Sequence, residues 1–354
     1  MDNLDLIPIQ NLYYLLLYAW NRLEEADVVN VSTEDSTSLL NLFTRVLIAG
    51  TQHLLKRGLD RGYIPFQEDL RGIRGKINFG ITLKRQLMAN AMLACEFDDL
   101  SHNVVHNRIL KKTIAELAIS LGVDRSLRSE LADLSRRLST IDEITLSASM
   151  FRRISLHRNN AFYGFLMDVC EMVYHYYLVS EAPGKERFRS FIRDENKMPQ
   201  VFEDFVRNFY KIELEGKYSG YQVKGAEIIL WDVDQPENED IKFLPAMVTD
   251  ISLKTPSRYL IIDAKYYKNT LQIYYDKKIH SANLYQLFSY LKNIEAKGPN
   301  YKGCNGILLY PTVQHNLDLN YEIQGHRISI KTIDLSKQWQ TISSELLKIV
   351  GAEG

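Results

Sequence analysis

Residues 244–268 read LPAMVTDISLKTPSRYLIIDAKYYK, and this stretch decides the fold of the second half of the chain. An apolar run leads to Asp250, the turn-forming KTPS segment reverses the chain, and a second apolar run leads to Asp263. Side chains two residues apart in a strand share a face, so Asp263 and Lys265 are expected to point the same way and Ala264 the other way. If the two strands pair as a hairpin, Asp250 approaches Asp263 across the ladder. Two carboxylates and a lysine then converge.

This group of side chains suits metal-assisted hydrolysis of a phosphodiester. Carboxylate oxygens are ligands for Mg²⁺, which keeps several waters and binds substrate phosphate directly. The metal lowers the pKa of a bound water, and a nearby lysine orients that water or stabilises negative charge. The alternative is a solvated ion pair between Asp263 and Lys265, which is common at this spacing on a strand. The apolar LIID lead-in and the upstream Asp250 favour the metal site.

Two helices near this stretch carry further polar candidates. Gln286 and Tyr290 lie four residues apart in NLYQLFSYL and therefore share a helix face. A glutamine there can hold a phosphate or fix a catalytic side chain, although a surface amide on an amphipathic helix explains it equally well. Glu203, in VFEDFVRNFY, is a candidate third carboxylate, with a solvated helix-face acid as the alternative.

The periodicity of the second half predicts an α/β fold, α+β over the whole chain, with helices flanking a mixed sheet. The expected elements are a helix at 199–213, strands at 222–231, 242–253 and 258–265, a helix at 281–296, a strand at 306–311 and a hairpin at 321–334.

The first half is expected to mix helices with β-hairpins. Helical spacing of apolar residues occurs at 11–25, 38–58, 104–122, 125–138 and 161–180. Between them, glycines punctuate residues 59–100 into short runs such as RGYIPFQEDL and GKINFGITL, which read as strands and hairpins.

The length of 354 residues allows two domains. We expect an N-terminal domain at 1–155, a helix and linker at 156–198, and a C-terminal domain at 199–354. Residues 181–198 are polar and contain proline and glycine, as a linker does.

The composition is that of a soluble globular protein, with 45% hydrophobic and 25% charged residues. No apolar run approaches the roughly 20 residues of a membrane-spanning helix, and the N-terminus lacks the basic region of a secretory signal. The three cysteines lie far apart, which argues against a zinc site or disulfides and favours the cytoplasm. Because the net charge is −1, any binding of DNA must rest on local basic surface or on a partner.

Other chemistries find little support. No G-x-x-x-x-G-K-[ST] motif is present to cradle nucleotide phosphates, and no G-x-S-x-G elbow occurs. His102 and His106 lie four residues apart but without a nearby third ligand, which disfavours a metal site there.

The order of Asp250, Asp263-Ala264-Lys265 and Gln286 resembles the PD-(D/E)xK nuclease superfamily, with Thr249 in place of its proline. That proline is not a metal ligand, so the change weakens the motif more than the chemistry. The sequence as a whole resembles the McrC family, the nuclease subunits of McrBC-type modification-dependent restriction systems. The segments that carry this resemblance are IPIQNLYYLLLYAW (7–20), RGIRGKINF (71–79), HNRILKKTI (106–114), DAKYYK (263–268) and NLYQLFSYL (283–291).

The resemblance implies that Asp250 and Asp263 bind Mg²⁺ with the Ala264 carbonyl, that Lys265 assists the nucleophile and that Gln286 supports the site. It also implies a partner, a McrB-like AAA+ GTPase hexamer whose pore the N-terminal region contacts and whose hydrolysis it stimulates. Residues 59–85 are our candidate for the inserted element, with Arg71, Arg74 and Lys76 as its basic side chains. The alternative there is an ordinary hairpin with solvated basic residues.

The resulting hypothesis is a Mg²⁺-dependent endonuclease subunit that cuts double-stranded, modified DNA in a GTP-dependent complex. Two alternatives stay open. One is a regulatory adaptor of an AAA+ motor with a vestigial nuclease fold, and the other is a RecB-like exonuclease acting on DNA ends.

Overall fold

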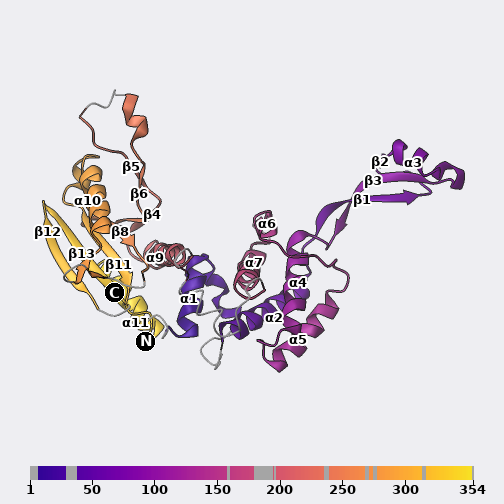
Figure 1. Ribbon diagram of the computed structural model, residues 1–354, viewed down its shortest axis with the longest axis horizontal. Helices are drawn as coiled ribbons and strands as arrows, with labels where there is room; N and C mark the ends of the chain where they lie inside the picture. Colours follow the sequence, from indigo (N-terminus) through magenta and orange to yellow (C-terminus); the bar gives the residue numbers. More distant parts are fainter. Residues whose placement is uncertain are drawn as a thin grey trace. The chain divides into compact units, whose positions relative to one another are not determined.

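The computed structural model describes residues 7–28, 38–157, 160–178, 194, 197–234, 239–267, 271–273, 277–312 and 316–352. The chain divides into two compact units (Figure 1). The sheet unit contains Met1–Ala26 and Lys185–Gly354, and the helical unit contains Asp27–Gly184. The expected borders at residues 155 and 199 differ from this division, because the first 26 residues group with the C-terminal half and helix α7 (Ala161–Val173) groups with the helical unit.

The sheet unit is built on a six-stranded mixed sheet, as predicted. The strand order is β12-β13-β11-β8-β7-β4. The strands are β4 (Gln222–Gly225), β7 (Ile251–Lys254), β8 (Tyr259–Ala264), β11 (Asn305–Pro311), β12 (Asp318–Ile323) and β13 (His326–Ile333). β11 runs parallel to β8 and β13, whereas β7 and β8 form the expected antiparallel hairpin.

Helix α10 (Ser281–Glu295) covers one face of this sheet. Its buried Leu287 and Leu291 pack in one apolar cluster with Ile261 of β8 and Leu308 of β11. Burying each such side chain contributes about 1.5–3 kcal/mol. Because strand side chains alternate, Asp263 lies on this same face as Ile261.

The opposite face is covered by α9 (Met198–Leu214) and α11 (Trp339–Ile349), and α1 (Ile9–Ala19) packs on α9 (Figure 1). Trp339 stacks on Tyr18 of α1, with ring centroids 5.5 Å apart. The Tyr18 hydroxyl donates to Glu213 Oε1 at 2.7 Å. The N-terminal helix, which we expected at 11–25 in a separate N-terminal domain, is thus part of the core of the sheet unit.

Two predicted strands are interrupted. The strand expected at 222–231 breaks between β4 and β5 (Ile228–Ile229), where Ala226 has a φ of 51°. The strand expected at 242–253 becomes a 3-10 helix η7 (Glu239–Phe243), then β6 (Met247–Val248) and β7. β5 and β6 pair as a separate two-stranded sheet, so the chain leaves the main sheet just before Asp250.

Some short elements of the sheet unit were not expected. They are η2 (Leu23–Val28), β9 (Leu271–Ile273), β10 (Lys277–Ile279), η8 (Pro299–Tyr301) and the helix α11.

The helical unit contains α2 (Leu39–Arg57), α4 (Val105–Ile119), α5 (Arg125–Arg137), α6 (Ala148–Phe151) and α7, which continues as a π-helix η6 (Tyr174–Leu178). α2, α4, α5 and α7 with η6 match the predicted helices at 38–58, 104–122, 125–138 and 161–180, whereas α6 was not expected. None of the described helices combines the length and apolarity that a membrane crossing requires.

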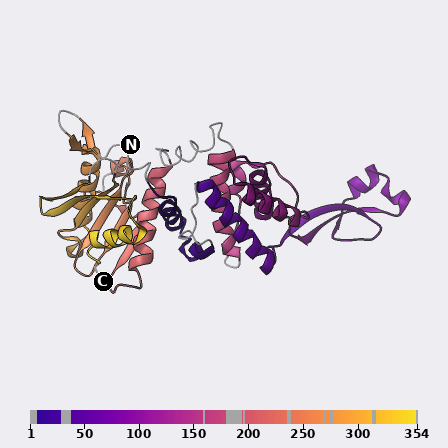
Figure 2. The same ribbon diagram turned by 90° about the horizontal axis from the view of Figure 1, so that it is seen from below.

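An antiparallel pair of strands projects from these helices in both views (Figures 1 and 2). We call Gly62–Ser101 the arm: β1 (Gly62–Leu70) and β3 (Leu93–Ser101) form its stem, with Gly62 paired to Ser101. Its tip carries β2 (Lys76–Ile77), α3 (Phe79–Lys84) and η4 (Leu87–Asn90).

The tip corrects the prediction of strands throughout 59–100. Asn78 caps α3, because its Oδ1 accepts a hydrogen bond from the Ile81 N–H at 3.0 Å, and the chain becomes helical there. Gly75 has a φ of +65°, and a Cβ atom at this position would lie 2.3 Å from the Glu96 carbonyl oxygen. Glycine is therefore required where the tip packs against β3.

The foot of the arm is held by a buried polar network. The Asn107 side chain donates to the carbonyl oxygens of Asp60 and His102, just before β1 and just after β3, and accepts from the Tyr163 hydroxyl at 2.7 Å. His106 Nε2 lies 3.0 Å from the Asp60 carboxylate. The HNR motif at 106–108 thus ties both ends of the arm to α4 and α7. His106 is paired with an acid and not with a second histidine.

Candidate functional site

The structure brings Asp250, Asp263 and Lys265 together at the end of the β7–β8 hairpin. Asp250 directly precedes β7, and Asp263 lies within β8 with a fully buried side chain. The Ala264 N–H donates to Asp250 Oδ2 at 3.0 Å, which fixes the first carboxylate beside the second. The predicted convergence of these residues across the hairpin is therefore observed.

Lys265 bridges the two acids. Its Nζ lies 2.9 Å from Asp263 Oδ1 and 3.5 Å from Asp250 Oδ2. Burial works against the charged form, but the two carboxylates raise the pKa of Lys265 above its usual value. The ion pair considered from the sequence does exist, but it is buried, unlike a solvated surface pair, which stabilises a fold by little.

The pKa of Asp263 is raised to about 7, mainly because burial disfavours the charged form and also because Asp250 is close. Lys265 acts in the opposite direction but does not cancel these effects. Asp263 is therefore a carboxylate that the fold accommodates at a cost in stability, which Lys265 offsets only in part.

This shift predicts the effect of Asp263→Asn on metal-free protein. An unfolded aspartate has a pKa of about 3.9. The stability from the protonated carboxyl is therefore full below about pH 4 and is lost as the pH rises through about 7. In EDTA, Asp263→Asn should be more stable than the unsubstituted chain at about pH 8, by on the order of 4 kcal/mol. Urea unfolding across this pH range measures the difference, which should vanish toward about pH 4.

Asp318→Asn is the matched control. The pKa of Asp318 is lowered, mainly by its hydrogen bond from Lys331, so removing its charge should lower stability at high pH. A stability difference for Asp263→Asn that does not change with pH would contradict this account.

The residues present fit a divalent cation. Both oxygens of Asp263 are buried without a hydrogen-bond partner, although Lys265 Nζ lies near Oδ1. Within the part of the chain that the structure describes, no three His, Cys, Asp or Glu side chains cluster at ligand spacing. Mg²⁺ keeps several waters, so two carboxylates are enough to bind it when water and substrate phosphate are the other ligands. A closed structural metal site would need more protein ligands.

Glu203 lies near these residues on α9. Its pKa is raised by burial and by the charge of Asp250, so its carboxylate is within electrostatic range of the site. Its Oε1 accepts a hydrogen bond from Arg207 at 2.9 Å. Glu203 is thus placed beside the two aspartates but is engaged in an ion pair on its own helix.

Gln286 contacts Tyr290 on the same helix. Its Nε2 donates to the Tyr290 hydroxyl at 2.7 Å, and the Gln286 side chain is exposed. The pKa of Tyr290 is raised, first by burial and also by the charges of Asp263 and Asp250. The predicted shared face of these two residues is observed. Of the two, Tyr290 is the residue whose pKa is affected by the carboxylates.

A second polar chain borders the site and was missed from the sequence. The Tyr267 hydroxyl donates to Asn283 Oδ1 at 3.2 Å, and Asn283 Nδ2 donates to the Tyr310 hydroxyl at 3.1 Å. The pKa of Tyr310 is raised to about 12, mainly by burial and partly by the charge of Asp263. Tyr310 lies two residues beyond Leu308, which pairs in parallel register with Asp263. The apolar GILLYP run gives no local sign of that register.

The predicted basic residues Arg71, Arg74 and Lys76 lie at the tip of the arm. Arg74 is not free, because it pairs with Asp99 at 3.1 Å and its guanidinium lies 4.0 Å from the centre of the Phe97 ring. Arg71 and Lys76 are exposed and form no ion pair with any residue that the structure describes.

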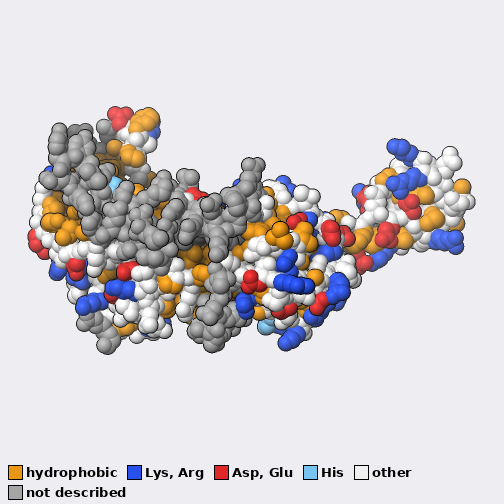
Figure 3. All heavy atoms as spheres, turned by 60° about the horizontal axis from the view of Figure 1, so that its bottom comes forward, with side chains coloured by type: hydrophobic (Ala, Val, Ile, Leu, Met, Phe, Trp, Pro, Cys, Tyr) orange, Lys and Arg blue, Asp and Glu red, His pale blue; other side chains and the backbone are white. Residues whose placement is uncertain are grey.

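Large apolar side chains share this tip with the basic ones. Figure 3 shows hydrophobic and basic side chains side by side at the end of the arm. The exposed apolar residues of the tip are Ile73, Phe79, Leu83 and Met88. Large apolar side chains that gather on a solvent-facing surface commonly mark an interaction site. This favours an interaction surface over an ordinary solvated hairpin.

Comparison with known proteins places these features in a family. Residues 9–311 match the family described as "McrBC 5-methylcytosine restriction system component". The chain is 32% identical over 344 residues to the type IV methyl-directed restriction enzyme EcoKMcrBC of Escherichia coli K12, and the alignment covers 97% of each chain.

A solved structure shares the fold. It is a half-complex from a tetradecameric assembly of Thermococcus gammatolerans McrB AAA+ hexamers with bound McrC. The TM-score is 0.57 at 14% identity, with 97% of this chain and 75% of that chain covered. Both the mixed α/β class and the arrangement of the elements therefore have a precedent.

Proposed function

The chain belongs to the family of McrBC 5-methylcytosine restriction system components, and from this membership we propose that it is the Mg²⁺-dependent DNA-cleaving subunit of such a complex. The observation that carries the proposal is the buried pair of Asp250 and Asp263 with Lys265 between them. Burial raises the pKa of Asp263 even with Lys265 beside it, and a bound divalent cation would explain why this carboxylate is kept in the interior.

In the proposed reaction Asp250 and Asp263 would hold Mg²⁺, together with the Ala264 carbonyl. Bound there, the cation would lower the pKa of a water and offset charge on the scissile phosphate. With a cation on the carboxylates, the Lys265 ammonium would orient the attacking water or donate to a phosphate oxygen. Gln286 holds the Tyr290 hydroxyl next to the carboxylates. Glu203 adds negative charge at the same edge of the sheet.

The arm is the proposed element for binding the partner. In the relative from Thermococcus gammatolerans, McrC is bound to McrB AAA+ hexamers. We extend this to the present chain, with the partner a McrB-like hexameric GTPase and the arm tip inserted into its pore. Support comes from the exposed Phe79 and Leu83, the free Arg71 and Lys76, and the clamped foot of the arm.

The test is a cleavage assay on 5-methylcytosine-containing plasmid with the purified chain, a McrB-type partner, Mg²⁺ and GTP. Double-strand cuts in circular plasmid that require all four components are the expected result. Cleavage of linear substrate only would replace the proposal with an exonuclease. GTPase stimulation without any cleavage would replace it with the regulatory adaptor.

A further inference from the structure

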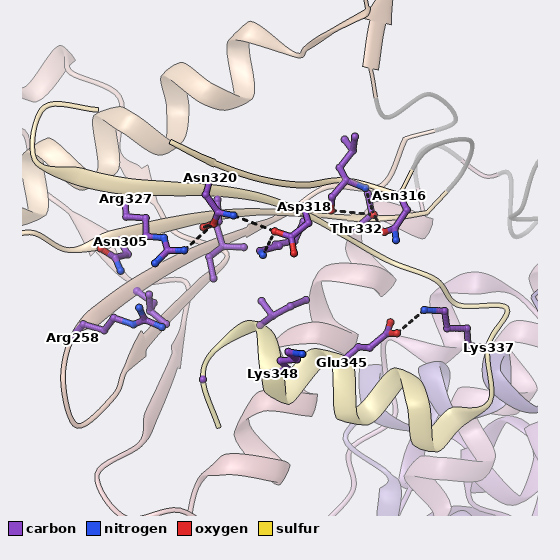
Figure 4. A pocket seen from close by; sticks show the side chains of 17 residues that line it. Arg258, Asn305, Asn316, Asp318, Asn320, Arg327, Thr332, Lys337, Glu345 and Lys348 are labelled. Carbon is purple, nitrogen blue, oxygen red and sulfur yellow. Dashed lines mark hydrogen bonds and ion pairs between the residues drawn. The ribbon is translucent and has the colours of Figure 1, made fainter. Parts of the chain in front are cut away.

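A polar groove lies on the face of the sheet opposite Asp263. It has a volume of about 400 Å³ and runs between the sheet and α11 (Figure 4). Its floor includes the buried side chains of Leu260, Ile307 and Ser329, from three neighbouring strands. Leu260 and Ile307 are the sequence neighbours of Ile261 and Leu308, which face α10, so the groove is separated from the nuclease site by the sheet itself.

The groove concentrates positive charge in a chain whose net charge is −1. Two of its lining residues are acidic, Asp318 and Glu345. Five are basic, namely Arg258, Arg327, Lys331, Lys337 and Lys348.

Both acids are already neutralised by lysines. Lys331 pairs with Asp318, and Lys337 pairs with Glu345. Arg327 Nη2 donates to the uncharged Asn320 at 3.2 Å. The side chains of Arg258 and Lys348 form no ion pair or hydrogen bond with any other residue in the described ranges.

The three remaining cations come from three separate elements. Arg258 lies in the β7–β8 turn, Arg327 on β13 and Lys348 on α11, and Figure 4 shows all three around the same groove. Like charges held together by the fold repel one another, and an anion between them removes that repulsion. Guanidinium groups match pairs of phosphate oxygens, and the amide of Asn305 adds a neutral donor.

We propose that this groove binds a phosphate group, carried either by a free nucleotide or by the backbone of a nucleic acid. A phosphate suits it better than a carboxylate because it offers more negative charge and more acceptor oxygens to donors that surround it. The proposal does not depend on nuclease activity, since the groove and the buried aspartates lie on opposite faces of the sheet.

The test is calorimetric titration of the full chain in EDTA with three probes: inorganic phosphate, deoxycytidine monophosphate and a short single-stranded oligonucleotide. The variant is the double substitution Arg258→Gln with Lys348→Gln. We expect its dissociation constants to rise by about ten-fold or more, because two charge-assisted contacts are lost. The matched control, Lys211→Gln with Lys302→Gln, removes the same charge from exposed sites outside the groove and should bind like the unsubstituted chain.

The probes separate the two sources of phosphate. Equal affinity for the mononucleotide and the oligonucleotide indicates a free nucleotide. Tighter, salt-sensitive binding of the oligonucleotide, lost in the groove variant, indicates a backbone. If the groove variant binds all three probes as well as the control does, with an unchanged thermal unfolding midpoint, the groove is not a phosphate site.

Discussion

Replacing Asp263 or Lys265 by alanine is expected to lower the rate of DNA cleavage by about a thousand-fold or more. Asp263 is fully buried with Lys265 Nζ 2.9 Å from its Oδ1, and each substitution removes a group that the proposed reaction uses directly. Without Asp263 one proposed carboxylate ligand of Mg²⁺ is lost, and without Lys265 the proposed donor to the attacking water or phosphate is lost. The measurement is the single-turnover rate on methylated plasmid with saturating partner, Mg²⁺ and GTP.

The controls for this result are Glu322→Ala and Lys302→Ala, which remove exposed charges of each sign from the same unit. They should cut at the unsubstituted rate. All four variants should bind the partner and stimulate its GTPase normally, because the substituted residues lie outside the arm. An Asp263→Ala protein that cuts normally while remaining folded would refute the assignment of the site.

The second large effect is expected at the tip of the arm. The double substitution Phe79→Asp with Leu83→Asp should weaken binding of the partner by about a hundred-fold and abolish stimulation of its GTPase at moderate concentrations. The two side chains lie four residues apart on α3 and are 59% and 64% exposed, so the substitutions leave the core intact. Burying them against a partner would contribute a few kcal/mol, and a buried aspartate would reverse that gain.

The matched control uses the helical body of the same unit. Ile119 and Leu121 are 75% and 91% exposed, and Ile119→Asp with Leu121→Asp adds the same charge away from the arm. It should stimulate normally. If both double variants stimulate equally well, the tip does not contact the partner. If the Phe79 and Leu83 variant also loses cleavage in parallel with stimulation, cutting depends on the motor.

Local sequence patterns were enough to predict that Asp250, Asp263 and Lys265 lie together. The KTPS turn, the two apolar runs and the i, i+2 spacing of Asp263 and Lys265 determine a hairpin and a shared face, which the structure shows. The parallel pairing of β11 with β8 brings Tyr310 to the same site, but such pairing depends on a crossover through α10. The sequence of neither strand contains a pattern that predicts this pairing.

The differences in fold have similar causes. Short helices such as α3 depend on one cap, Asn78, within a glycine-rich segment that otherwise has the texture of strands. Helix α1 was predicted correctly as a helix. Its apolar side chains, however, do not indicate which distant surface they pack against. Its packing on α9 is set by Tyr18, Glu213 and Trp339, which are separated by more than a hundred residues.

The packing of α1 on α9 has a consequence for biosynthesis. Asn208 of α9 donates to the Tyr18 carbonyl oxygen, and Asn11 of α1 donates to that of Leu335, so the first helix completes a unit whose other elements are translated last. While the ribosome makes the intervening residues 27–184, α1 must wait without its partners, whereas the helical unit already has all of its own. The residues of the arm are therefore translated before Asp250, Asp263 and Lys265. A prematurely terminated chain would therefore carry the proposed partner-binding arm without the assembled group of Asp250, Asp263 and Lys265.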